Sequence, residues 1–160
     1  MNSELYKLAQ KTVSLASDKS VSIAFAESCT GGLIGASVTD ISGASCVFMG
    51  SAVTYSNNAK INVLKVPEEI IEQNGAVSSE CAIAMVCGAA EIYSADIAVS
   101  VTGVAGPDGG TEEKPVGTVW FGLYSHGRKK SFLHHFSGTR REIRELTAAE
   151  ALKLIIEELS

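Results

Sequence analysis

Residues 21–32 read VSIAFAESCTGG, and this stretch decides the fold. Its first six residues are mostly apolar and include β-branched side chains, which is typical of a short buried strand. They run into the turn ESCTGG (27–32), after which helical character resumes over residues 33–41. A strand, a glycine-bearing turn and a helix in this order place Ser28 above a strand end and close to a helix N-terminus.

Strands and helices continue to alternate on both sides of this stretch. Apolar residues at helical spacing follow Ser3, and Ser78 is positioned to cap a later helix. We expect strands at 47–55, 97–101, 117–124 and 130–136, with helices ending near Leu64, between Pro67 and Gly75, and after Ser78. The pattern predicts a three-layer α/β/α sandwich with a mixed β-sheet, formed by residues 1–160 as one domain.

The last predicted helix has a well-defined start. Thr139 and Glu142 have the T-x-x-E spacing of a capping box, and apolar residues then recur at helical spacing. The stripe predicted to face the core consists of Ile143, Leu146, Ala149, Leu152, Ile156 and Leu159.

Composition narrows the class of protein. The 160 residues are 46% hydrophobic and carry a net charge of −5, which provides for a substantial core and disfavours nucleic-acid binding, since that needs a basic surface. No stretch has the apolar length of a membrane span, and the N-terminus lacks a signal-peptide pattern. The four cysteines show no C-x-x-C spacing. We therefore expect a cytoplasmic protein with reduced thiols that binds neither membrane nor nucleic acid.

Ser28 is the first candidate for chemistry. At the junction of a strand and a helix, backbone N–H groups and the helix dipole can stabilise an oxyanion, and Gly31 and Gly32 allow a ligand to approach the backbone. The structural alternative is that Ser28 or Thr30 simply caps the helix. The segment is not a G-x-S-x-G elbow, because Ala26 and Thr30 occupy the glycine positions. The neighbouring Cys29 is a rival nucleophile, although a small buried side chain is its simpler role.

A serine nucleophile needs a base. The three histidines lie at 126, 134 and 135, in or beside the predicted hairpin, and nothing in the sequence connects them with Ser28. Lys60 is the alternative base, because burial can lower the pKa of a lysine. It follows a predicted strand in a region with few charges, near Tyr55. The structural alternatives are a solvated lysine and a half-buried strand tyrosine.

Two further segments suit ligand binding. Residues 102–111, beginning with Thr102 and Gly103, are dense in glycine and follow a strand, although turn chemistry alone also explains such composition. Arg140 and Arg141 lie in the first turn of the last helix, where a positive charge opposes the helix dipole. A bound anion such as a phosphate would account for them; exposed arginines are the alternative.

Cofactor motifs are missing from the sequence. Tyr55 and Lys60 are one residue too far apart to resemble the Tyr-x-x-x-Lys pair of short-chain dehydrogenases. No G-x-G-x-x-G or Walker motif is present, and the cysteines, histidines and acidic residues show no metal-ligand spacing. We therefore expect neither a cofactor nor a bound metal.

Several long motifs in a fixed order resemble those of the CinA C-terminal domain family. They are AESCTGG (26–32), YSNNAK (55–60), GAVS (75–78), TGVAGPDGG (102–110) and EKPVGTVWFG (113–122). The resemblance extends from the first predicted helix to the last. The family includes the stand-alone nicotinamide-nucleotide amidases called PncC, and the resemblance implies a three-layer α/β/α domain and a homodimer.

The resemblance also implies an activity and its residues. Family members hydrolyse nicotinamide mononucleotide to nicotinate mononucleotide and ammonia, within pyridine nucleotide recycling. The family's serine, lysine and tyrosine correspond to Ser28, Lys60 and Tyr55, and its threonine and arginine to Thr102 and Arg140. Ser28 would form an acyl-enzyme with Lys60 and Tyr55 as proton carriers, while Arg140 would hold the 5′-phosphate.

The remaining expected contacts come from the backbone. N–H groups from Thr30 to Gly32 would hold the oxyanion, and Gly103 would line the substrate site. Two alternative functions stay open at this point. The chain could be a catalytically silent binding or regulatory module of the family, or an amidase for another small carboxamide.

Overall fold

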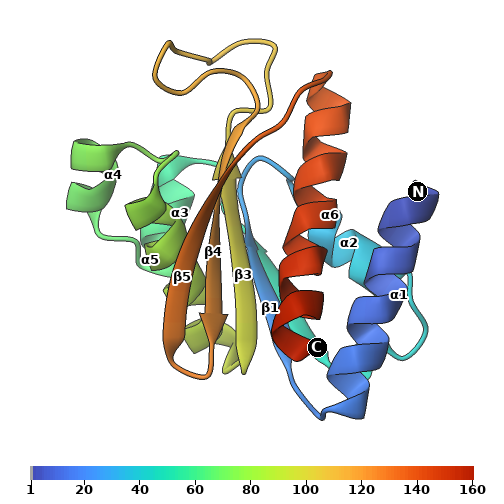
Figure 1. Cartoon of the computed structure of the whole chain (residues 1–160). Coiled ribbons are helices and arrows are strands. Elements are labelled where there is room, and N and C mark those ends of the chain that lie inside the picture. The colour runs from blue at the N-terminus through green and yellow to red at the C-terminus, as the bar shows by residue number, and fades with distance from the viewer. Residues whose placement is uncertain (1) are drawn as a thin grey trace.

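The computed structural model describes residues 2–160, and its elements follow the order expected from the sequence (Figure 1). A short 3-10 helix, Ala44–Cys46, precedes the second strand. The remaining elements are α1 Ser3–Asp18, β1 Ile23–Glu27, α2 Leu33–Thr39, β2 Phe48–Val53, α3 Asn57–Leu64, α4 Glu68–Asn74, α5 Ser79–Tyr93, β3 Ile97–Gly103, β4 Thr118–Ser125, β5 Arg128–His135 and α6 Arg140–Leu159.

The five strands form one mixed sheet in the order β2-β1-β3-β4-β5. β1 runs parallel to β2 and β3, whereas β4 is antiparallel to both β3 and β5. At the end of β1, Glu27 pairs with Val53 of β2 and Val101 of β3. The carboxyl ends of the three parallel strands therefore meet at one edge of the sheet, where the Ser28 turn begins.

Helices cover both faces of the sheet, so the expected three-layer α/β/α architecture is confirmed. Figure 1 shows α1, α2 and α6 on one side and α3, α4 and α5 on the other. One apolar core fills the first side and a smaller one, rich in alanine, fills the second. All five residues of β1 are buried, as its largely apolar sequence predicts for a strand covered on both faces.

Local sequence signals account for several element boundaries. The capping box of α6 is present as expected: the Thr139 side chain accepts from the Glu142 N–H, and the Glu142 carboxylate accepts from the Thr139 N–H. β4 and β5 are joined by His126 and Gly127, both with positive φ, a two-residue turn whose twist suits a hairpin. Ser78 caps α5 by accepting from the Cys81 N–H.

Close packing fixes α3 against α5. A Cβ atom at Gly88 of α5 would overlap the carbonyl group of Leu64 at the end of α3. Glycine is therefore required for the two helices to approach this closely. The contact matters because Lys60 lies one turn earlier on α3. The burial of the Lys60 side chain therefore depends on the position of this helix.

Asn2 caps α1, its side chain accepting from the Glu4 N–H. One detail differs from the sequence prediction. Leu146 is 43% exposed, so its assignment to the core-facing stripe of α6 is wrong. The buried face instead follows residues spaced by about four, such as Ile143, Thr147 and Ala151, which turns Leu146 to the side. No helix among residues 2–160 combines the length and apolar content that crossing a membrane requires.

Candidate active site

Ser28 and Lys60 lie in direct contact, although 32 residues separate them in the chain. The Lys60 Nζ atom is 2.9 Å from the Ser28 Oγ atom. Ser28 follows β1, and Lys60 is carried by α3, which follows the neighbouring β2. Parallel pairing of β1 and β2 brings the two following segments to the same edge of the sheet. Ser28 is 8% exposed and Lys60 only 1%, so the exposed-lysine alternative does not describe this chain.

The surroundings of Lys60 favour its neutral form. Burial lowers the pKa of Lys60 below its ordinary value, because a charged amine loses hydration in the interior. No carboxylate forms an ion pair with its amine among the described residues. A lysine with a lowered pKa loses its proton at a lower pH than an ordinary lysine, and the neutral amine can serve as a general base.

Two backbone carbonyls orient the amine. Lys60 Nζ lies 2.9 Å from the Thr54 carbonyl oxygen and 3.1 Å from that of Tyr55, in addition to the Ser28 hydroxyl. A neutral amine has two N–H donors and one lone pair. Both carbonyl oxygens can only accept, so they take the two N–H groups. The lone pair then faces the one partner that carries a proton, the Ser28 hydroxyl.

The buried Glu27 carboxylate organises the turn that carries Ser28. It is fully buried and takes the place of a side-chain N-cap for α2, whose N-cap residue is Gly32. Neither Ser28 nor Thr30 caps the helix. The Glu27 carboxylate accepts from five donors at 2.7–3.0 Å: the Thr30 and Ser51 hydroxyls and the N–H groups of Gly32, Ile34 and Gly35.

The backbone donors near Ser28 differ from those expected. Gly31 N–H donates to the Ser28 carbonyl oxygen, and Gly32 N–H donates to Glu27. Both are thus occupied within the chain, which corrects the expectation that they hold an oxyanion. The N–H groups of Cys29 and Thr30 form no hydrogen bond with any residue from 2 to 160. Of these two residues only Cys29 lines the pocket, whereas Thr30 has no exposed surface. A contact of the Thr30 N–H with a ligand stays a prediction.

Cys29 is poorly suited to the role of nucleophile. It is 5% exposed, and burial raises the pKa of its thiol to about 11. The thiolate is the reactive form of cysteine, so this thiol is largely unreactive near neutral pH. The adjacent serine, in contact with the buried amine, is the better candidate.

A pocket of about 280 Å³ opens beside the two residues. Ser28 and Lys60 line its inner part, together with apolar side chains such as Val77 and Val104. Tyr55 and Arg140 lie at the exposed rim. The remaining lining residues are Cys29, Asn57, Ala76, Thr102, Gly103, Ala105, Gly106, Asp108 and Gly109. A site with a reactive pair inside and an arginine at its rim suits a small ligand that carries an anionic group.

Arg140 joins two segments of this rim. Its guanidinium donates to the Gly106 carbonyl oxygen at 2.8 Å and to the Tyr55 hydroxyl at 2.9 Å. A guanidinium has five N–H donors, so three remain for a ligand. The neighbouring Arg141 turns to Glu145 on the surface and does not line the pocket. The structure thus separates the two arginines that the sequence presented together.

Tyr55 and Thr102 reach the site in ways the sequence did not indicate. The Tyr55 carbonyl contacts Lys60, whereas its phenol is bound by Arg140; a role as proton relay stays a prediction. The Thr102 hydroxyl donates to the Ala76 carbonyl oxygen at 2.8 Å, which holds the GAVS segment against the pocket. Gly103 lines the pocket at the end of β3.

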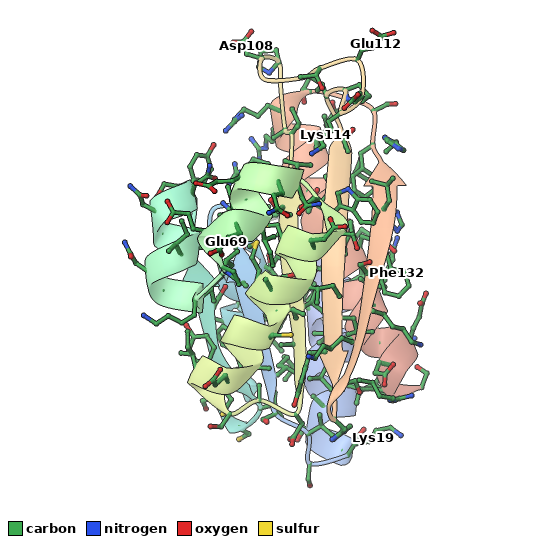
Figure 2. The ribbon with its side chains drawn as sticks, turned by 90° about the vertical axis from the view of Figure 1, so that its left-hand side faces the viewer. Lys19, Glu69, Asp108, Glu112, Lys114 and Phe132 are labelled. Atoms are coloured by element: carbon green, nitrogen blue, oxygen red, sulfur yellow. The ribbon has the colours of Figure 1, made fainter. Side chains whose placement is uncertain are left out.

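The loop between β3 and β4 extends beyond the sheet on the side of the pocket. Figure 2 shows Asp108 and Glu112 at its outer end, with Lys114 closer to the body of the protein. Lys114 donates to the Asn74 carbonyl oxygen at the end of α4, and Arg140 binds Gly106 near the other end of the loop. Both ends of the loop are therefore attached to neighbouring elements.

Sequence reasoning missed two residues that support the turn. Glu27 carried a usable signal, since a charged residue at the end of an otherwise apolar buried strand needs partners. The sequence contains no comparable signal for Arg144 of α6. Arg144 donates to the carbonyl oxygens of Cys29 at 3.2 Å and Thr30 at 2.7 Å, more than 110 residues away in the chain.

The fold and site define a class of protein: a three-layer α/β/α domain with a buried serine–lysine pair at the carboxyl ends of its parallel strands. Comparison with known proteins gives the family. A model of the CinA C-terminal domain matches residues 5–159. The chain is 49% identical over 148 residues to a CinA-like protein of Dictyoglomus thermophilum, covering 92% of this chain and 36% of that protein. A CinA-like protein of Geotalea uraniireducens is 48% identical over 139 residues, which cover 87% of this chain and 33% of that protein.

Solved structures agree closely with this one. A competence/damage inducible protein of Agrobacterium tumefaciens is similar with a TM-score of 0.94 and 37% identity, covering 98% of this chain and 96% of that one. A CinA superfamily protein of Klebsiella pneumoniae is similar with a TM-score of 0.94 and 30% identity, and the match covers 97% of each chain. The chain belongs to the CinA C-terminal domain family. It spans about a third of the length of the curated relatives it matches.

Proposed function

We propose that the chain is a nicotinamide-nucleotide amidohydrolase, which converts nicotinamide mononucleotide and water to nicotinate mononucleotide and ammonia. The observation that carries this proposal is the 2.9 Å contact between the Ser28 hydroxyl and the buried Lys60 amine at the inner end of a pocket. The resemblance of the site motifs to the family's nucleotide amidases supplies the substrate. We also propose that the protein acts in the cytoplasm and as a homodimer, as that resemblance implies.

The first half of the reaction forms an acyl-enzyme. Neutral Lys60 takes the proton of Ser28 as the serine oxygen bonds to the carboxamide carbon. The N–H group of Cys29, which lines the pocket, stabilises the resulting oxyanion. When the tetrahedral intermediate collapses, the carbon–nitrogen bond breaks and Lys60 returns the proton to the nitrogen, which leaves as ammonia. The positively charged pyridinium ring of the substrate makes its carboxamide more electrophilic.

The second half regenerates the enzyme. Water attacks the acyl carbon and gives a proton to Lys60, and a second tetrahedral intermediate forms at the same N–H group. Its collapse breaks the bond to the Ser28 oxygen, which recovers its proton from Lys60. Nicotinate mononucleotide is released with its new carboxylate.

The positions of the residues that line the pocket suit this substrate. The reacting pair lies inside and Arg140 lies at the rim with three unused N–H donors. A ligand with its carboxamide at Ser28 and its ring along Val77 and Val104 would direct its ribose phosphate outward. An arginine fork matches the geometry of a phosphate group. Arg140 would then distinguish the nucleotide from free nicotinamide.

The proposed function is tested by incubating purified protein with nicotinamide mononucleotide. We expect one ammonia per molecule consumed and a product about one dalton heavier, as conversion of an amide to an acid requires. Nicotinamide riboside, nicotinamide and an unrelated aliphatic carboxamide serve as comparison substrates. If the protein hydrolyses only another carboxamide, that compound and not nicotinamide mononucleotide is the substrate. If it hydrolyses none of these compounds, a binding module is the better interpretation.

Replacement of Arg140 by alanine should weaken nucleotide binding selectively. Loss of charge-assisted hydrogen bonds to a phosphate should raise KM for nicotinamide mononucleotide about ten- to a hundredfold. KM for nicotinamide riboside, which has no phosphate, should change far less. Arg141→Ala is the matched control from the same helical turn and should leave both constants near those of the wild type. Equal changes for the two substrates in Arg140→Ala would rule out the phosphate role.

A further inference from the structure

Strand β3 ends beside Ser28 and contributes backbone groups to the pocket. Two of the residues that line the pocket, Thr102 and Gly103, belong to this strand. Along a strand, successive residues direct their N–H and C=O groups to opposite edges in turn. The direction of each of these two N–H groups therefore follows from the pairing of β3 with β1 on one edge and β4 on the other.

Hydrogen bonds near the end of β3 show which edge each residue faces. The Val101 carbonyl oxygen accepts from the Ser28 N–H at 3.1 Å, so Val101 faces β1. The Val104 N–H donates to the Thr118 carbonyl oxygen at 2.9 Å, so Val104 faces β4. Gly103 lies two residues beyond Val101 and one before Val104. Its N–H therefore faces the same edge as Val101, towards the Ser28 turn.

The end of β1 leaves the Gly103 N–H without its usual acceptor. If β1 continued as a parallel strand, the Ser28 carbonyl oxygen would accept from this N–H. The chain turns at Ser28 instead, and that carbonyl oxygen accepts from the Gly31 N–H at 3.0 Å. The Gly103 N–H forms no hydrogen bond with any residue from 2 to 160.

This free N–H lies at the surface of the pocket. Gly103 is partly exposed and lines the pocket together with Ser28, Lys60 and Cys29. The pocket thus has the Ser28 hydroxyl at the end of β1 and the Gly103 N–H at the end of β3, and the N–H points towards the β1 side. A backbone N–H without a protein acceptor is normally bound by water or a ligand.

We propose that the Gly103 N–H is a second donor to the oxyanion and acts together with the Cys29 N–H. As the Ser28 oxygen bonds to the carboxamide carbon, the substrate oxygen gains negative charge between the ends of β1 and β3. Hydrogen bonds to this oxygen strengthen as the charge develops, so they stabilise the transition state more than the bound substrate. This inference rests on the proposed function, because it assumes acyl transfer at Ser28.

Packing against β4 holds this donor in place. A Cβ atom at Gly103 would lie 2.7 Å from Val119 Cγ2 and 2.8 Å from the Thr118 carbonyl oxygen. Both distances are too short for a side chain, so Gly103→Ala would shift the end of β3 and the N–H with it. The role of the N–H is therefore tested by a spectroscopic signal and by the replacement of one backbone atom.

The first measurement follows the amide protons of Gly31 and Gly103 by NMR. These are the two glycines that follow a threonine in the sequence, so isotope labelling of glycine nitrogen and threonine carbonyl carbon selects both signals. An alkyl fluorophosphonate bonds its phosphorus to the Ser28 oxygen, releases fluoride and leaves the serine proton on Lys60. Its phosphonyl oxygen then occupies the position of the oxyanion.

In the labelled protein the Gly103 proton should move downfield and exchange more slowly with solvent, because it gains an acceptor. The Gly31 proton is the internal control, since it already binds the Ser28 carbonyl oxygen, and it should move much less. An unchanged Gly103 signal in fully labelled protein, or equal shifts of both signals, would overturn the proposal.

The same experiment separates this proposal from the proposed function. If the protein reacts with the fluorophosphonate but does not hydrolyse nicotinamide mononucleotide, the proposed substrate is wrong, and the Gly103 signal still decides the role of its N–H. If the nucleotide is hydrolysed but the Gly103 signal stays unchanged after labelling, the proposed function stands and this inference fails.

The second measurement removes the donor itself. Gly103→glycolic acid replaces the N–H by an ester oxygen and adds no side chain. We expect kcat for nicotinamide mononucleotide to fall about 100- to 1000-fold with KM nearly unchanged, as for loss of one oxyanion donor. Gly127→glycolic acid, in the turn between β4 and β5, is the control for the ester and should keep the kcat of the wild type.

A further control covers the effect of the ester on the sheet. An ester at Gly103 also weakens the Thr102 carbonyl as an acceptor, and Thr102 pairs with Trp120 of β4. Replacement of Trp120 by its hydroxy acid removes the N–H on the other side of this pair and leaves the Gly103 N–H in place. If Gly103→glycolic acid keeps the kcat of the wild type, or loses no more than the Trp120 variant, the Gly103 N–H is not an oxyanion donor.

Discussion

Replacement of Ser28 by alanine should abolish ammonia release from nicotinamide mononucleotide while leaving the fold intact. Loss of an activated nucleophile typically lowers kcat by a factor on the order of 10⁴ to 10⁶. The change removes one oxygen atom from a side chain that is 8% exposed, so we expect little effect on the free energy of unfolding. Steady-state rates, with circular dichroism and a thermal melt of both proteins, provide the measurement.

Cys29→Ala is the matched control, because it alters the neighbouring residue in the same turn. With a thiol pKa of about 11, Cys29 is expected to contribute no nucleophile, and this variant should keep kcat within a few-fold of the wild type. If activity survived in Ser28→Ala and were lost in Cys29→Ala, the nucleophile would be Cys29 and not Ser28.

Replacement of Lys60 by methionine should have the second-largest effect. Methionine preserves most of the length and apolar volume of the buried side chain but removes the base, which typically lowers the rate about 10²- to 10⁴-fold. In the wild type, kcat/KM should rise with pH as Lys60 loses its proton and level off once the amine is neutral. Because burial lowers the pKa of Lys60 from 10.5, the midpoint of this rise should lie below that value.

Lys65→Met provides the control for this second prediction. Lys65 directly follows the same helix, but its amine is exposed and donates to the Asn62 carbonyl oxygen. It should show the rate and the pH profile of the wild type. An unchanged pH profile in Lys60→Met, or a midpoint at or above 10.5 in the wild type, would show that another group accepts the serine proton.

Much of the fold follows from local patterns in the sequence. The apolar stretch before Ser28, the Pro67–Gly75 boundaries of α4 and the Thr139–Glu142 capping box each depend on neighbouring residues and physical preferences that operate locally. Leu146 shows where such reasoning fails. Whether a position on α6 is covered depends on where α1 and the sheet lie relative to the helix, and periodicity alone does not contain that information.

The sequence motifs point to Ser28 and Lys60, but not to the contacts that these residues make. The contact between Ser28 and Lys60 depends on the parallel pairing of β1 with β2. The hydrogen bond of the Gly32 N–H depends on Glu27, whose carboxylate folds back over the next turn. Arg144 reaches the turn from the last helix. A contact across more than 110 residues leaves no spacing pattern to recognise.

The strand order β2-β1-β3-β4-β5 has a consequence of its own. The chain leaves β1 towards β2 across one face of the sheet and returns from β2 to β3 across the other (Figure 1). In the sheet, β2 lies beside β1 on one side and β4 lies beside β3 on the opposite side, so the segments that leave the carboxyl ends of β1 and β3 diverge. Such a divergence is the topological switch point where open α/β sheets commonly bind ligands. The crevice arises from backbone connectivity. The loop after β3 could accordingly change to suit other ligands while the serine turn and its supports stayed the same.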